Sequence, residues 1–203
     1  KRAIINATKG ARVYSGTETF IDSGGLANLK AYFTATMQGE EPPRVIVFID
    51  ELEKAMKGAG GDTSGVSDAI HAYVLTFMAD ERVDGTLLYG VPGCGKSMIC
   101  KALANEYRVP LIMLDVEGLK ESFVGASGVN ARNFFNMIKA IGQGRYLFVA
   151  TANNLEPISP ELRSRFAPTF FFDLPTDEER APIVDIHARR YEVDATDMPD
   201  IAG

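Results

Sequence analysis

The residues best suited to chemistry form the motif Gly90-Val91-Pro92-Gly93-Cys94-Gly95-Lys96-Ser97, which fits the pattern G-x-x-x-x-G-K-[ST]. Its glycines allow a tight loop whose backbone N–H groups surround phosphate oxygens, and a helix beginning near Lys96 adds positive potential. Lys96 would reach the β- and γ-phosphates of a nucleotide, and the Ser97 hydroxyl would ligate Mg²⁺. A chance glycine turn is the alternative. The full register favours a site for ATP or ADP with Mg²⁺.

Two adjacent carboxylates form the second group with chemical potential. Asp50 and Glu51 follow the apolar run 45–49 and would lie at the carboxyl end of a buried strand, where ligands of open α/β sheets gather. Asp50 would belong to the Mg²⁺ shell, and Glu51 would orient or deprotonate the attacking water. The acids could instead simply begin a helix, whose N-terminus favours negative charge.

Alternating strands and helices must position these groups. Continuous apolar runs predict five strands covered on both faces, at 45–50, 86–89, 110–115, 146–150 and 169–174. Helical spacing of apolar residues predicts helices near 26–33, 66–78, 96–107, 128–141 and 177–191. This alternation predicts a three-layer αβα sandwich with a five-stranded parallel sheet.

Composition limits the function classes. The chain has 203 residues, enough for one domain plus a small appendage, with 21 basic and 27 acidic residues and a net charge of −6. This balance argues against broad binding to nucleic acid or anionic membranes. No apolar run is long enough to span a bilayer, and no signal peptide is evident at the N-terminus. The two cysteines, Cys94 and Cys100, cannot form a disulfide framework. We expect a cytoplasmic setting.

The motifs together resemble those of the AAA+ ATPases, in the branch of protein-remodelling rings. The resemblance covers most of residues 20–190 and implies a P-loop NTPase fold with ATP hydrolase activity. It adds Ser23 and Gly24, from a segment similar to that leading into the adenine pocket, to the nucleotide-binding residues. The complete predicted set for the nucleotide is Ser23, Gly24, Gly90, Val91, Pro92, Gly93, Cys94, Gly95, Lys96, Ser97 and Met98.

Three weaker matches extend the resemblance. Phe123-Val124-Gly125 looks like the pore loop that grips a threaded polypeptide, or Phe123 caps a hydrophobic edge. Asn153 looks like the sensor-1 residue that contacts the attacking water, or it is a turn residue at a strand end. Arg165 looks like the arginine finger that serves a neighbouring subunit, or it is a surface charge. The predicted catalytic residues are therefore Glu51, Asn153 and Arg165, with Asp50 and Ser97 for the metal.

One departure from the family is large. In the family the phosphate-loop unit precedes the Asp-Glu unit, whereas here the Asp-Glu unit (44–84) precedes the phosphate-loop unit (85–144). Moving the first block behind the second restores the family order without a gap. The transposition has junctions at 43/44, 84/85 and 144/145, all in loops, which indicates an engineered, rewired core rather than a natural rearrangement.

Whether a site survives depends on the strand order. The family sheet implies the order 5-1-4-3-2, which becomes 5-2-4-1-3 along this chain if every strand keeps its place. If the strands exchange places instead, the phosphate loop moves to a sheet edge and Asp50 lies roughly 14 Å away. We expect the strands to keep their positions in the sheet, because lengthening a loop costs only about 0.6 kcal/mol per doubling of its length. Exchanging the strands would leave mismatched side-chain volumes in the core, which costs more than a longer loop.

The resemblance also sets the expected domains and partners. Residues 1–175 would form the core and 176–203 the start of a truncated helical lid, which puts ring assembly in doubt. We therefore expect ATP or ADP and Mg²⁺ as ligands, weak or absent hydrolysis in isolation, and a monomer rather than a self-associated form. The alternatives are a topology scaffold without a ligand and a ring-forming ATPase that remodels polypeptides.

Overall fold

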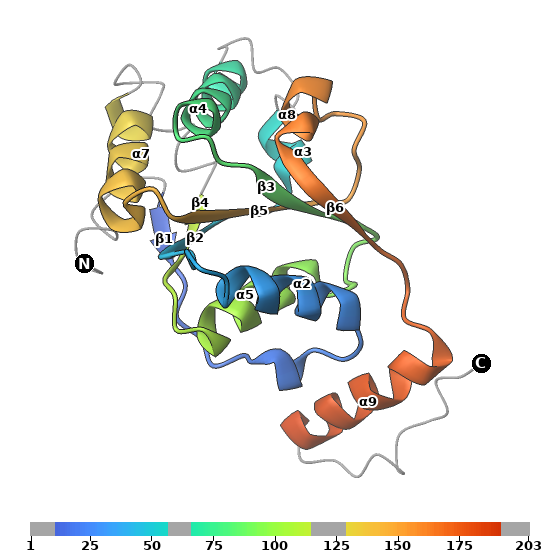
Figure 1. The fold of residues 1–203 in the computed structure, drawn as a ribbon. Coiled ribbons are helices and arrows are strands. Elements are labelled where there is room, and N and C mark those ends of the chain that lie inside the picture. Colours follow the sequence, from blue (N-terminus) through green and yellow to red (C-terminus); the bar gives the residue numbers. More distant parts are fainter. Residues whose placement is uncertain (1–10, 57–65, 115–128, 192–203) are drawn as a thin grey trace.

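The sheet of this protein, seen in a computed structural model that describes residues 11–56, 66–114 and 129–191, has six strands (Figure 1). The strands are β1 (Ala11–Val13), β2 (Val45–Ile49), β3 (Gly85–Gly90), β4 (Leu111–Leu114), β5 (Tyr146–Ala152) and β6 (Phe166–Phe172). Their order across the sheet is β1-β4-β2-β5-β3-β6. All neighbouring pairs are parallel except β1 and β4.

The prediction of a five-stranded, all-parallel sheet is therefore wrong in number and in direction. The additional strand, β1, is antiparallel to β4 and pairs with it through three residues. It is too short to show the apolar pattern that identifies a strand in a sequence. It forms because the edge of β4 offers unpaired backbone groups. The other five strands, numbered along the chain as predicted, lie in the order 5-2-4-1-3.

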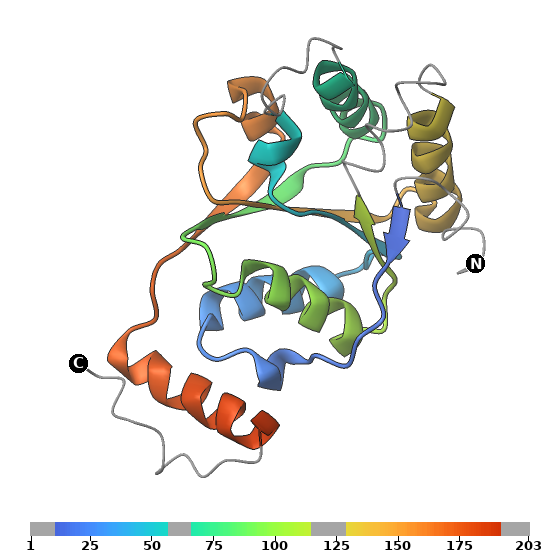
Figure 2. The same ribbon diagram turned by 180° about the vertical axis from the view of Figure 1, so that it is seen from behind.

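Helices cover both faces of the sheet, as the turned view in Figure 2 also shows. On one face lie α3 (Leu52–Met56), α4 (Val66–Asp80), α7 (Val129–Gly142) and α8 (Pro160–Ser164). On the other lie α2 (Ala27–Met37) and α5 (Lys96–Glu106), with the 3₁₀ turn η1 (Phe20–Asp22) and α9 (Asp177–Tyr191) farther out. No helix in the described ranges is both long and apolar enough to cross a membrane.

Each face has its own hydrophobic core. Side chains of β5 alternate between them: Leu147 and Val149 pack with α2 and α5, whereas Phe148 and Ala150 pack with α4 and α7. This alternation is the two-residue period of a strand buried on both faces. It also fixes the direction of the polar side chains that follow each strand.

The three predicted junctions all precede strands. Residues 44, 84 and 144 lie directly before or next to the first residues of β2, β3 and β5, which are adjacent in the sheet. There the backbone N–H of Arg44 donates to the carbonyl of Arg145 at 3.0 Å. The side chain of Arg44 also donates to Gln143. The junctions therefore lie at the amino edge of the sheet.

Candidate functional site

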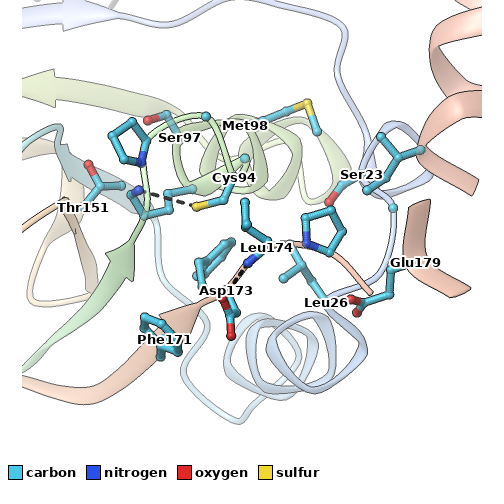
Figure 3. Close-up of a pocket in the computed structure, with 18 of the residues that line it drawn as sticks. Ser23, Leu26, Cys94, Ser97, Met98, Thr151, Phe171, Asp173, Leu174 and Glu179 are labelled. Atoms are coloured by element: carbon cyan, nitrogen blue, oxygen red, sulfur yellow. Dashed lines mark hydrogen bonds between the residues drawn. The ribbon is translucent and has the colours of Figure 1, made fainter. Parts of the chain in front are cut away.

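A cavity of about 850 Å³ opens at the carboxyl edge of the sheet. The loop before α5 forms one side of it, the ends of β2 and β5 form its floor, and the chain after β6 together with α9 forms the far side (Figure 3). Of the predicted residues, those that line it are Ser23, Gly24, Asp50, Glu51, Pro92, Gly93, Cys94, Gly95, Lys96, Ser97, Met98 and Asn153. Groups from four separate stretches of the sequence meet here.

The phosphate loop has the backbone that its glycines predict. Gly93 and Gly95 have φ values of 82° and 88°, in the left-handed region that favours glycine. A Cβ at either position would meet no atom within 4 Å, so both glycines border open space. At Gly90 the reason for glycine is different, since a Cβ there would lie 1.9 Å from the carbonyl oxygen of Phe172. The loop therefore forms an open cradle of backbone on a tightly packed base.

Lys96 closes the base of this cradle. Its side chain is buried, and its Nζ donates to the carbonyls of Gly90 at 2.8 Å and Val91 at 2.7 Å. Gly90 and Val91 do not line the cavity themselves, and they contribute through these carbonyls. Among the described residues the hydrogen-bond partners of this buried ammonium are neutral, so it attracts an anion strongly.

The acidic pair meets the phosphate loop directly. Ser97 Oγ donates to Asp50 Oδ1 at 2.8 Å, across the intervening strand β5. A hydroxyl and a carboxylate at this distance, next to an open cradle, are the oxygen ligands that Mg²⁺ takes in protein sites. The donor set therefore fits a magnesium ion with a bound phosphate.

Glu51 is held at both carboxylate oxygens. Its Oε1 accepts a hydrogen bond from Asn153 Nδ2 at 3.3 Å, and its Oε2 pairs with Lys54 Nζ at 2.6 Å. The hydrogen bond to Glu51 raises the pKa of Lys54, so Lys54 stays positively charged. Glu53, one residue before Lys54, is buried and accepts a hydrogen bond from the backbone N–H of Asn153 at 2.9 Å. Asn153, directly after β5, is therefore bonded both to Glu51 and to Glu53 of α3.

The far side of the cavity is mostly apolar. It is formed by Leu26, Phe171, Leu174, Ile183 and Ile186, with Asp22, Asp173, Glu179 and His187 at its margin. Phe171 and Leu174 are 57% and 69% exposed. A Cβ at Gly24 would lie 2.5 Å from Ile183 Cγ1, so α9 packs closely on the segment after η1. An apolar slot next to a phosphate cradle suits the flat base of a nucleotide.

Lys30 holds the segment after η1 in place. Its Nζ donates to the carbonyls of Phe20, at 3.0 Å, and of Ser23. Partial burial lowers the pKa of Lys30 from its ordinary value. The loop that carries Ser23 and Gly24 is thereby anchored to α2.

The predicted arginine finger, Arg165, does not line the cavity. Arg165 follows α8, and its carbonyl accepts the N–H of Gly85 at 2.7 Å, at the start of β3. Since β3 is six residues long, Arg165 lies roughly 17 Å from the phosphate loop, at the opposite edge of the sheet. Phe123, Val124 and Gly125 lie outside the described residues.

Sequence reasoning missed several lining residues. The most informative is Thr151, whose Oγ1 donates to Asp50 Oδ1 at 2.6 Å. The alternation of side chains along β5 could have revealed Thr151. Leu147 and Val149 point toward α5, and Thr151 is the next residue on that face. His187 also borders the cavity. The apolar residues of α9 gave no signal, because nothing in their spacing shows which cavity they face.

The cysteines have no assigned chemistry here. Complete burial raises the pKa of the Cys100 thiol well above its usual range, which disfavours the reactive thiolate. Cys94 borders the cavity, and its Sγ donates to the carbonyl of Val91 at 2.9 Å. Both thiols are free.

Comparisons with known proteins give relatives for part of the chain. Residues 86–143 match the family model AAA, "ATPase family associated with various cellular activities". The chain is 29% identical over 147 positions to the "Uncharacterized AAA domain-containing protein ycf46" of Guillardia theta, covering 52% of this chain and 29% of that protein. It is 29% identical over 139 positions to the "ATP-dependent zinc metalloprotease FtsH 3" of Petrotoga mobilis, covering 63% of this chain and 20% of that protein.

A solved structure is also similar. The AAA domain of FIGL-1 in complex with ADP aligns with 93% of this chain and 66% of that chain, with a TM-score of 0.47 and 15% identity. The chain spans about three tenths of the length of the first curated relatives. The family match and the sequence relatives support an AAA+ P-loop NTPase domain.

Proposed function

We propose that this chain is a nucleotide-binding core of AAA+ type that holds ATP or ADP with Mg²⁺. The single observation that carries the proposal is the 2.8 Å hydrogen bond from Ser97 to Asp50, which joins the phosphate loop to the acidic pair. In the proposed complex the loop N–H groups and Lys96 bind the β- and γ-phosphates, and Ser97 and Asp50 hold the metal. The Mg²⁺ ion would neutralise charge on the phosphates.

Hydrolysis by this chain alone is proposed to be weak. The proposed roles are Glu51 as the residue that orients or deprotonates the attacking water and Asn153 as its polar partner. In the described arrangement both oxygens of Glu51 are engaged, one by Asn153 and the other by Lys54. Each contact takes up one lone pair of a carboxylate oxygen and restricts the directions from which water can approach. We therefore expect turnover to be faster when Glu51 is released from Lys54.

The transposed chain order is part of the proposal. One sequence relative supports it, because the alignment with the Guillardia theta protein has 147 positions but takes up only 52% of the 203 residues. About 40 positions of that relative thus have no counterpart in sequence order here, close to the length of the block 44–84. The family match also ends at residue 143, next to the proposed junction 144/145. Deliberate engineering of this order stays a prediction.

The proposed division is a core of residues 1–175 followed by a lid segment from 176. Close packing of α9 against Gly24 supports a lid role for that helix. The position of Arg165 at the far edge of the sheet supports the second candidate, a ring-forming ATPase, because Arg165 would serve only a nucleotide held by another copy. Light scattering with ATP and Mg²⁺ separates the two, since the monomer that we favour removes any role for Arg165.

Nucleotide titration tests the main proposal. We expect saturable ADP and ATP binding by calorimetry, with a rise in Tm that corresponds to about 2.7 kcal/mol at 100 times the Kd. Lys96→Ala should weaken binding by about a hundredfold, because it removes the buried cation of the cradle. Lys101→Ala is the matched control on the same helix, where Lys101 lies over the ring of Tyr14. A folded wild type that binds neither nucleotide would reject the proposal in favour of a scaffold without a ligand.

A further inference from the structure

The hydroxyl of Thr151 connects the two members of the acidic pair. Its Oγ1 donates to Asp50 Oδ1 at 2.6 Å and accepts the backbone N–H of Glu51 at 2.9 Å. Thr151 is 1% exposed, so both groups would lose a partner that water cannot easily replace. A hydrophobic residue of the same shape would fill the space equally well. The polar contacts therefore need a reason other than packing.

The strand register explains why this hydroxyl reaches both groups. Ile49 of β2 pairs with Ala150 of β5, so Asp50 and Thr151 come next on their strands. The side chains of Phe48 and Val149 point toward α5, and those of Asp50 and Thr151 follow two residues later on the same face. Thr151 thus lies between the acidic pair and the phosphate loop.

Two features of the acidic pair require such support. Ser97 and Thr151 both donate to the same oxygen, Oδ1 of Asp50, which fixes the rotation of that carboxylate. Glu51 has a φ of 51°, an uncommon left-handed conformation for a residue with a side chain. The bond from its N–H to Thr151 holds this conformation. Without the hydroxyl, Asp50 would be free to turn away from Ser97.

We propose that Thr151 is a positioning residue that presents Asp50 and Glu51 to the Mg²⁺-bound nucleotide. This inference rests on the proposed function and adds a specific consequence to it. Thr151 acts through Asp50 and contacts no nucleotide group itself, so its loss should weaken the magnesium-dependent part of binding. The magnesium-independent part comes from the loop and Lys96, and it should remain.

The test compares Thr151→Val with two matched variants. Thr151→Ser retains the hydroxyl. Thr86→Val removes the hydroxyl of another threonine with 1% exposure, on β3, whose Oγ1 lies 3.1 Å from the hydroxyl of Tyr32 and far from the acidic pair. ADP affinity is measured by calorimetry in EDTA and at a series of free Mg²⁺ concentrations, and the Tm of each nucleotide-free protein is recorded.

We expect Thr151→Val to raise the Mg²⁺ concentration for half-maximal effect about tenfold, the consequence of losing one hydrogen bond to a charged group. Affinity in EDTA should not change, and Thr151→Ser and Thr86→Val should behave like the wild type. An equal loss of affinity with and without Mg²⁺ would show a purely structural role and overturn the inference. If the valine variant does not fold, Thr151→Cys, a weaker donor, should give a smaller shift, and no shift would overturn the inference.

Titrations of the wild-type protein distinguish a failure of this inference from a failure of the proposed function. Wild-type protein that binds ADP without any effect of Mg²⁺ would remove the metal from the proposed function. Wild-type protein with a clear Mg²⁺ effect that Thr151→Val leaves unchanged would reject only the role of Thr151.

Discussion

The two edges of the central sheet differ in what holds them together. At the amino edge the chain enters β2, β3 and β5 through the three proposed junctions, and the contacts there include the partly exposed ion pair of Glu81 and Lys139. At the carboxyl edge the polar side chains Asp50, Ser97 and Thr151 are joined by short hydrogen bonds. Connections can therefore change at one edge while the arrangement of side chains persists at the other.

The physical reason is the difference between the costs of loops and of cores. A longer or redirected loop costs a fraction of a kcal/mol, whereas a strand in the wrong place leaves mismatched volumes in a close-packed interior. The strands β2, β5 and β3 are neighbours, so redirected connections among them remain short. If this comparison holds, the stability of the fold should depend on packing between the blocks 44–84 and 85–144. Nucleotide binding should depend on the side chains at the carboxyl edge alone.

The largest effect is expected from Phe77→Ala. Phe77 of α4 packs against Phe135 of α7, at 4.8 Å between ring centroids, and against Phe148 of β5, at 5.6 Å, so it joins the blocks 44–84 and 85–144 to the segment that follows them. Its truncation should lower the free energy of unfolding by about 3–5 kcal/mol, measured by denaturation in urea. Nucleotide affinity of the folded fraction should stay the same. A loss of less than about 1 kcal/mol would mean that the blocks do not depend on this contact.

An intermediate effect, on function rather than fold, is expected from Asp50→Asn. The change removes the charge that accepts hydrogen bonds from Ser97 and Thr151, and ADP affinity in Mg²⁺ should fall by about a hundredfold. Asp80→Asn, at the end of α4, is the control that changes the same charge outside the cavity. Equal ADP affinities of the two variants would mean that the side chains at the carboxyl edge do not contribute to nucleotide binding.

The smallest effect concerns the amino edge. The hydrogen bond from Lys139 lowers the pKa of Glu81 below its ordinary value of 4.5, and the hydrogen bond from Tyr146 lowers it further. A lowered pKa in the folded state stabilises the protein above the unfolded value, and this stability is lost as the pH falls through the folded pKa. Glu81→Gln should therefore reduce Tm by about 2 °C at pH 7 and by less at pH 3. A difference in Tm that grows toward pH 3 would contradict this sign.

Strong local patterns made most of the fold predictable. The runs that became β2 and β5 are short, continuous and apolar, which is typical of a strand buried on both faces. The phosphate loop was predictable because glycine at 93 and 95 meets a backbone requirement that other residues meet poorly. β1 was missed because three residues are too few to show an apolar pattern. These residues form a strand because they pair with β4.

The sequence by itself indicated which residues are candidates for binding phosphate and metal, because the glycine spacing, the lysine and the acidic pair are local features. Only the tertiary structure decided that the groups meet, since the chain visits Asp50 before Ser97 and the strand order alone brings them to 2.8 Å. The same holds for Thr151, Glu53 and the apolar residues of α9. Their role depends on which strand or helix lies beside them, and long-range packing sets that arrangement.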